Sequence, residues 1–547
     1  MKKLIHILLL LVLPAVFFTG LHKYKDALGE YYLGRNYDPS YAYLINSLNL
    51  AQFKGYGVGL ISHPGTPVQE IGAVVLLITH SMKSGNTDIV TDVFENPEYY
   101  LNKICSTFLF LISTAIFLLG SAVYLKLKSI TTALFFQLTP FSFYSEDIYF
   151  QLTNVSVEPL LVFTALLLIA SIILFLNKAD SEKHNLNYAV VFGILCGLGM
   201  SVKISFFPVM IIPFLMLKKF RLKGVLILSS VISFLIFIYP AFSSHNVNEF
   251  ILWVRDLVTH SGKYGTGTEN LVDTSSYLNN VRIIFSKNLV FTFTYISALI
   301  ICIMQLTEKY KLKIRSNRYF ILLPGIFLAM TFQILIVAKH FSLYYMIPAY
   351  IFSIPGLYAL NSVLLSVFPD LIITKKGKYT YYSVTVILII VYSVIQIRMI
   401  NKDRKQSAVA RNEARKIISA LESEFKNSIV ISSYECSSRE FALYLGSSYG
   451  GTRYNSYISL VKEKYPKDIF FNRWNNTFYK EWNQDYVKDL LIKENKFIFQ
   501  GVSDDVALKF MDYIREFTNK PNVVNRKVLS GIDRDAVYEI TLDPGNQ

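Results

Sequence analysis

Residues 157–176 read VEPLLVFTALLLIASIILFL, a run of twenty residues whose only charge is the glutamate at its second position. A run of this length and composition crosses the hydrocarbon core of a bilayer as one helix. The sequence therefore predicts an α-helical polytopic membrane protein with about 11 transmembrane helices. The other apolar runs of near-spanning length lie at 4–18, 102–124, 129–143, 188–203, 204–217, 224–242, 288–306, 319–338, 342–366 and 379–398.

Composition separates this region from the end of the chain. Of the 547 residues, 52% are hydrophobic and 17% are charged, whereas soluble domains carry roughly 25% charged residues. The last 148 residues nevertheless hold 43 of the 93 charged residues. We therefore expect a transmembrane domain at 1–399 and a soluble α/β domain at 400–547. In the tail, strand-like patterns at 428–435, 495–502 and 536–542 alternate with helical patterns at 437–446 and 504–517.

The placement of charge predicts how the chain is oriented. The net charge of +15 does not indicate nucleic-acid binding, because the tail contributes only +3 and the other cations lie in short loops. If the N-terminus is cytoplasmic and the runs alternate, 18 of the 31 cations before the tail face the cytoplasm, as the positive-inside rule requires. The segment 63–82 must then lie at the membrane surface. We expect a bacterial inner-membrane protein with an extracytoplasmic tail.

The four cysteines indicate neither a disulfide framework nor a structural zinc site. Three of them lie in apolar runs, and Cys436 is the single cysteine of the tail. No cysteine or histidine spacing matches that of structural zinc ligands.

The first candidate site residue lies in a long outer loop at 21–101. Asp38 stands beside a proline and among tyrosines in YDPSYAYL, residues 37–44. An Asp-Pro turn that begins a surface helix is one interpretation of this pattern. The other is a carboxylate at the membrane–water boundary that accepts a proton or holds a metal ion, since aromatic residues suit an interfacial site.

Three more carboxylates belong to the second outer loop, 144–156, and its junction with the next span. Glu158 stands at the mouth of that span, directly before Pro159. A carboxylate there is unfavourable unless it has a partner or a function. Glu146 and Asp147 lie within the loop and are also compatible with ordinary solvated charges.

Candidate cations occur at similar depth. Lys203, in CGLGMSVKISFFP at 196–208, is either a snorkelling lysine or an anchor for a lipid phosphate. Lys339 and His340, beside the aromatic stretch that follows them, suit a phosphate in the same way. The glycine-rich stretch HSGKYGTG contains His260, Lys263 and Tyr264. Such a loop either cradles a phosphate or sugar hydroxyls or is simply flexible.

In their order and sidedness these features resemble the GT-C glycosyltransferases, which include the protein O-mannosyltransferases and the lipid A aminoarabinose transferases. The resemblance covers roughly residues 1–366. One departure is that relatives often have an arginine before the tyrosine of the last motif, where this chain has Ser342 and Leu343. The matching features are Asp38 after the first span, His63, Pro64 and Pro67 before a juxtamembrane helix, Glu158-Pro159, GILCGLGMSVK ending at Lys203, and HFSLYYMIPAY.

The resemblance implies transfer of a sugar from a polyprenyl-phosphate-linked donor, with inversion, to a glycan, lipid or protein acceptor at the extracytoplasmic face. It makes Asp38 the general base. Glu158, or else Glu146 or Asp147, would orient the acceptor or bind a divalent cation, and no other cofactor is implied. The cations that would bind the lipid phosphate are Lys203, Lys339, His340 and Lys263.

Three other interpretations stay open. The chain could be another enzyme of lipid-linked glycans, such as a polymerase or ligase. It could be a transporter or flippase of lipid-linked sugars, although transporters more often place polar groups in mid-span. It could also be a membrane anchor for the tail.

Overall fold

The protein consists of two compact units. A membrane unit comprises Met1–Lys23, Ile61–Glu70 and Cys105–Ile400, and a tail unit comprises Tyr24–Leu60, Ile71–Ile104 and Asn401–Gln547. Much of the loop expected at 21–101 therefore belongs to the same unit as the tail. The computed structural model describes residues 2–34, 37–53, 57–61, 64–83, 87–143, 145–177, 181–244, 247–259, 274–339, 341–369, 375–520, 522–531 and 535–543.

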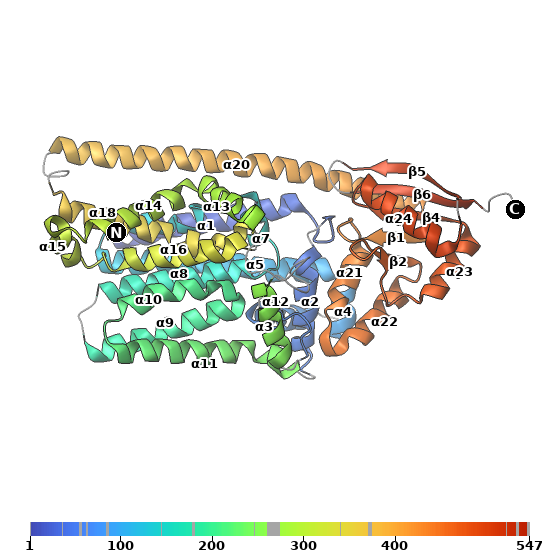
Figure 1. The fold of residues 1–547 in the computed structure, drawn as a ribbon, viewed down its shortest axis with the longest axis horizontal. Helices are drawn as coiled ribbons and strands as arrows, with labels where there is room; N and C mark the ends of the chain where they lie inside the picture. Colours follow the sequence, from blue (N-terminus) through green and yellow to red (C-terminus); the bar gives the residue numbers. More distant parts are fainter. Residues whose placement is uncertain are drawn as a thin grey trace. The chain divides into compact units, whose positions relative to one another are not determined.

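Seven helical segments among the described residues are long and apolar enough to cross a bilayer (Figure 1). The chain is therefore a multi-pass helical membrane protein. An eighth span results if α13 (Thr274–Lys287) and α14 (Leu289–Met304), which meet at a bend of 102°, cross together. The seven are α1 (Lys2–Leu28), α5 (Pro97–Leu127), α8 (Glu158–Leu176), α9 (Glu182–Val202), α11 (Phe220–Ser244), α16 (Leu322–Lys339) and the segment Leu343–Val367, made of η5 (Leu343–Met346), α17 (Ile347–Tyr350) and α18 (Ser353–Val367).

Two of the expected apolar runs do not form helices of spanning length. In the first run, 129–143, α6 (Ile130–Gln137) gives way to the 3-10 turn η2 (Thr139–Phe141), which contains a proline. In the second, 204–217, η3 (Ile204–Met210) contains Pro208 and is followed by the short α10 (Ile211–Met216). Proline removes a backbone donor and breaks the helical ladder. Because each crossing reverses the side of the membrane, the expected sidedness of the later loops stays a prediction.

Several shorter or polar helices complete the chain. The helix expected at the membrane surface is α3 (Thr66–Ser81), and its sixteen residues fall short of the roughly 20 that cross a bilayer. The apolar run at 379–398 lies inside the fifty-residue helix α20 (Lys375–Glu424). The remaining helices before the tail are α2 (Tyr37–Ala51), α4 (Ile89–Glu95), α7 (Glu146–Leu152), α12 (Val247–Thr259) and α15 (Glu308–Ser316).

Close packing of α9 on α11 fixes the end of α9 within the membrane unit (Figure 1). Gly193 and Gly197 lie one turn apart on α9, and a Cβ atom at Gly197 would come within 2.3 Å of the Ser230 carbonyl oxygen. The Ser230 hydroxyl donates to the Gly193 carbonyl at 3.1 Å. Small residues at this spacing let two membrane helices approach closely.

The tail forms a six-stranded sheet in the order β3-β2-β1-β4-β6-β5. The central strand β1 is parallel to β2 and β4, whereas the other neighbours pair antiparallel. The strands are β1 (Val430–Ser433), β2 (Asp468–Asn472), β3 (Thr477–Phe478), β4 (Lys496–Gly501), β5 (Asn522–Ser530) and β6 (Ala536–Asp543). The helices are α21 (Arg439–Ser448), the turn η6 (Gly451–Arg453), α22 (Tyr454–Lys464), α23 (Gln484–Glu494) and α24 (Asp504–Thr518).

An aromatic core joins α24 to this sheet. Phe499 of β4 stacks on Phe510 of α24, with ring centroids 3.9 Å apart. Phe471 of β2 meets the edge of the same ring at 4.8 Å. All three side chains are fully buried. Rings of this size bury large apolar areas and supply much of the stability of a small domain.

Within the tail unit, α2, which belongs to the loop 21–101, packs on α21. The buried Asn46 amide connects the two segments. Its Nδ2 donates to the carbonyls of Ala42 (2.7 Å) and Tyr449 (3.0 Å), and its Oδ1 accepts from Gly59 N–H at 2.6 Å. A second contact is so close that a Cβ atom at Gly446 would lie 2.8 Å from the Tyr41 carbonyl oxygen.

We expect Asn46→Ala to destabilise the tail unit. The change leaves the Gly59 N–H and the Tyr449 carbonyl without their side-chain partner, and each buried polar group left unpaired costs about 1–3 kcal/mol. The rate of alkylation of the buried Cys436, followed by mass spectrometry, reports opening of this unit. Alkylation should be faster than in the wild type and unchanged in Asn475→Ala, since Asn475 is exposed. If Cys436 were alkylated at the same rate in Asn46→Ala and Asn475→Ala, the proposed packing would be contradicted.

Asp468 should make stability depend on pH. Burial, with a contribution from Glu440, raises the pKa of Asp468 from 3.8 to about 8. Its folded-state pKa is thus above the unfolded value. The contribution of Asp468 to stability is therefore fully present below pH 4 and is lost as pH rises towards 8. Asp468→Asn should raise the free energy of unfolding at pH 8 by at least about 1 kcal/mol and flatten its pH dependence. Thermal unfolding at several pH values, with the exposed Asp489→Asn as control, checks this. An unchanged pH slope would disprove it.

Candidate functional site

A buried ion pair lies in the membrane unit. The Lys203 ammonium is 2.7 Å from Oε1 of Glu158, and the two side chains are 4% and 3% exposed. Glu158 is the first residue of α8, and Lys203 directly follows α9. Both groups therefore stand at helix ends. The structure brings together two residues that the sequence singled out separately.

Lys203 occupies an extended backbone position between α9 and η3. Its backbone N–H closes α9 on the Gly199 carbonyl at 2.9 Å. Lys203 also pairs with Pro64 in an isolated antiparallel bridge, and Gly65 N–H donates to the Ser201 carbonyl at 3.1 Å. The Pro64 stretch of the expected motif thus holds the backbone at Lys203, while His63 lies outside the described residues.

Two tyrosine rings face the Lys203 ammonium. Its Nζ lies 4.0 Å from the ring centroid of Tyr345 and 5.0 Å from that of Tyr344. Both tyrosines belong to η5, and the Gln333 amide of α16 donates to the Tyr345 carbonyl at 2.7 Å. Aromatic faces attract a desolvated cation. The aromatic stretch after Lys339 thus contributes its rings to the Lys203 site.

Polar groups without hydrogen-bond partners occur on the elements around the pair. Asn154, in the turn between α7 and α8, is fully buried, and neither its amide nitrogen nor its oxygen has a partner. Oε1 of Gln333 and the hydroxyl of Tyr350 also have no hydrogen-bond partner. Tyr350 lies on α17, which packs against both α8 and η5. Buried polar groups are nearly always paired in folded proteins. Their presence here is expected of a site that receives a polar ligand or ordered water.

The tail unit contains the other singled-out carboxylate, Asp38. It sits at a non-helical break in α2, with φ −100° and ψ 116°. The Tyr434 hydroxyl donates to Oδ2 of Asp38, and the Tyr37 hydroxyl accepts from Glu435 N–H. Burial and the Asp38 carboxylate raise the pKa of Tyr434 well above its ordinary value. Tyr434 therefore acts as a neutral donor to a half-buried carboxylate.

The other expected site residues lie elsewhere or are not described. Asp147 is exposed on α7, and Glu146 begins that helix but its side chain is outside the described residues. Lys339 is the last residue of α16. His260, Lys263, Tyr264 and His340 all lie outside the described residues.

Sequence reasoning missed Tyr434 and Tyr345 as partners of the candidate site residues. Tyr434 directly follows β1, and its signal was its place near the end of the strand predicted at 428–435. Ligand sites gather at the carboxyl ends of parallel strands. Tyr345 stood within the quoted aromatic stretch, but nothing in the pattern indicated that its ring meets Lys203. Within the described part of the chain, no group of three histidine, cysteine or carboxylate side chains could hold a metal ion.

Compared with models of protein families, with curated proteins and with solved structures, the chain has no significant match. The site therefore has to be interpreted from its own chemistry. That chemistry is an ammonium–carboxylate pair shielded from water, with aromatic faces and unpaired polar groups on the neighbouring elements.

Removing one charge of this pair should destabilise the protein more than removing both charges. Glu158→Gln or Lys203→Met leaves one buried charge uncompensated, which typically costs about 3–5 kcal/mol. The double variant leaves no charge and should recover much of that loss. Thermal unfolding and the monodisperse fraction after extraction measure the effect. If the double variant lost as much as the two single variants added together, the pair would not be coupled.

Proposed function

We propose that the protein is an integral membrane glycosyltransferase of the GT-C type. It would transfer a sugar from a polyprenyl-phosphate-linked donor to a glycan, lipid or protein acceptor outside the cytoplasm. The observation that carries the proposal is the Glu158–Lys203 pair, buried at the ends of two apolar helices and faced by two tyrosine rings. Ionisable groups kept in a membrane domain at such cost usually serve function.

The position of the pair favours chemistry over transport. Transporters bind their substrates near the bilayer midplane, on interrupted helices. Glu158 is instead the first residue of α8 and Lys203 directly follows α9, so both lie at helix ends. A group that acts on a lipid headgroup has to reach the level of the headgroup, and residues at helix ends can do so.

Proposed roles follow from the chemistry of each group. The Asp38 carboxylate would accept the proton of the acceptor nucleophile as the acceptor attacks the anomeric carbon, and the bond to the donor phosphate would break with inversion. Lys203 would stabilise the negative charge on the departing phosphate. Glu158 would hold the Lys203 ammonium in place, so the two roles expected separately become linked.

Tyr434 would serve as a positioning residue for the base. Its hydroxyl donates to Oδ2 of Asp38 and so orients the carboxylate. A hydrogen bond to the charged form of a carboxylate lowers its basicity. Tyr434→Phe should therefore alter the pH dependence of transfer as well as its rate.

The test compares the wild type with Asp38→Asn in a strain that lacks the gene. Mass spectrometry of envelope glycolipids, glycans and proteins would detect a sugar-sized mass that returns with the wild type. Asp38→Asn should lower transfer about 10²- to 10⁴-fold, as the loss of a general base does. The exposed Asp489→Asn is the matched control and should transfer normally.

Each outcome distinguishes the interpretations. Full activity in Asp38→Asn would remove Asp38 as the base and favour another class of lipid-linked-glycan enzyme. No sugar-sized mass change with the wild type would favour transport or anchoring. Insertion of every variant is checked by its abundance in the membrane fraction.

A further inference from the structure

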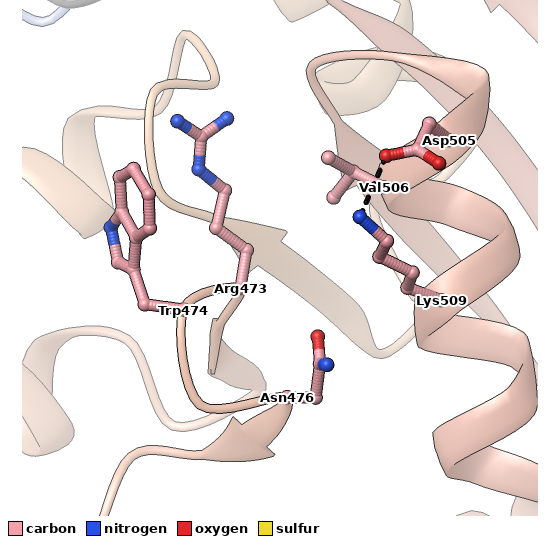
Figure 2. A pocket seen from close by; sticks show the side chains of 6 residues that line it. All are labelled: Arg473, Trp474, Asn476, Asp505, Val506 and Lys509. Atoms are coloured by element: carbon pink, nitrogen blue, oxygen red, sulfur yellow. Dashed lines mark ion pairs between the residues drawn. The ribbon is translucent and has the colours of Figure 1, made fainter. Parts of the chain in front are cut away.

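A cavity of about 370 Å³ lies in the tail at the carboxyl ends of the parallel strands. Small-molecule sites usually measure roughly 300–1,000 Å³. Its walls come from the turn between β2 and β3 and from the first turns of α24, as Figure 2 shows. The lining residues are Arg473, Trp474, Asn476, Asp505, Val506 and Lys509.

The topology of the sheet makes this edge a natural binding position. The chain leaves the central strand β1 for β2 on one side and later returns to β4 on the other. In open α/β sheets, ligands bind outside the carboxyl ends of the strands where the order reverses in this way. Glu435 follows β1, Arg473 follows β2, and α24 begins shortly after β4.

Trp474 is the exposed aromatic wall of the cavity. The chain has only three tryptophans, and Trp474 is 69% exposed, while Trp253 and Trp482 are 8% and 9% exposed. The Asn472 side-chain oxygen accepts from the backbone N–H of Trp474 at 3.0 Å and so fixes the turn that presents the indole. A large indole kept in water by an ordered turn indicates a stacking surface for a ligand.

The charges around the cavity balance. The Arg473 guanidinium pairs with Glu435 at 2.9 Å, and the Lys509 ammonium pairs with Asp505 at 2.9 Å. Each cation is therefore matched by an adjacent carboxylate, and the ligand need not supply a charge. Nε–H of Arg473 is buried without a partner, and the Asn476 amide adds a donor and an acceptor.

These groups do not suit a phosphate. Asp504 and Asp505 both lie in the first turn of α24, where the oxygens of a bound phosphate would be placed. A nucleotide stacked on Trp474 would therefore bring its phosphates towards carboxylates. An uncharged polyhydroxyl ligand can use both members of each ion pair, because its hydroxyls donate as well as accept.

We propose that this cavity binds an uncharged saccharide, with a sugar ring stacked on Trp474 and its hydroxyls bonded to Arg473, Asn476 and the Asp505–Lys509 pair. The inference about binding stands without the transfer reaction. Assigning the bound saccharide as the acceptor rests on the proposed function.

Binding is measured on the full chain in phospholipid nanodiscs, which keeps sugar-headed detergents away from the cavity. The probes are neutral di- to tetrasaccharides of glucose, mannose and N-acetylglucosamine, and their uronate and phosphate counterparts. Tryptophan fluorescence reports binding, because Trp474 is the exposed one of the three tryptophans. Calorimetry gives the affinity of variants that lack the indole.

We expect a neutral saccharide to bind with an affinity that changes less than roughly twofold between low and high salt, since no net charge is involved. Trp474→Ala should weaken binding at least about tenfold, and Trp474→Phe should retain part of it. Tyr486→Ala, which removes another exposed aromatic side chain, should bind normally. Binding of only the charged probes, or full binding by Trp474→Ala, would overturn the inference.

The transfer reaction provides a separate readout. If the wild type transfers sugar, Trp474→Ala should raise the KM for the acceptor with little change in kcat. Saccharide binding without any transfer would leave the cavity as assigned and remove the proposed function. Transfer without saccharide binding at the cavity would show that the cavity is not a saccharide site, and the proposed function would still stand.

Discussion

An ammonium and a carboxylate removed together from water place the strictest constraint on the membrane unit. Neither Lys203 nor Glu158 is tolerable there alone, since an uncompensated buried charge is strongly destabilising. Their contact requires that α9 end where α8 begins. The approach of α9 to α11 through Gly193 and Gly197, and the bridge to Pro64, set that position. The 3-10 turn η5, which begins the spanning segment Leu343–Val367, brings the Tyr345 ring over the same ammonium.

The tail unit is organised around a different requirement, the pairing of buried amide and hydroxyl groups. Asn46 and Tyr37 of the loop 21–101 bond backbone groups that follow α21 and β1. The sheet in turn places the ends of its parallel strands around one cavity. Most of the loop 21–101 thus folds together with the tail as one unit, and residues from both surround Asp38.

Hydropathy and alternation predicted the membrane class, strands β1, β4 and β6 of the tail and its helices α21 and α24, because these depend on local patterns. Proline breaks at Pro140 and Pro208 shortened two apolar runs whose hydrophobicity gave no warning. Strands β2, β3 and β5 were not predicted. β2 and β3 are short, and the mixed polar residues of β5 at the sheet edge alternate poorly. Glu158 and Lys203 were recognised singly, as unexpected charges. Their contact, and that of Asp38 with Tyr434, depends on tertiary packing that no local pattern encodes.

Because most of the loop 21–101 and the tail fold as one unit, their contacts can form only late in synthesis. Asp38 and Tyr434 are 396 positions apart, so a ribosome adding about 5–20 residues per second takes about 20–80 seconds between them. During that interval α2 has been made, but the Tyr449 carbonyl that accepts from Asn46 and the Glu435 N–H that bonds Tyr37 have not. The surroundings of Asp38 are therefore completed only after the last apolar run has left the ribosome. A nascent chain halted earlier would carry the carboxylate without the structure that holds it.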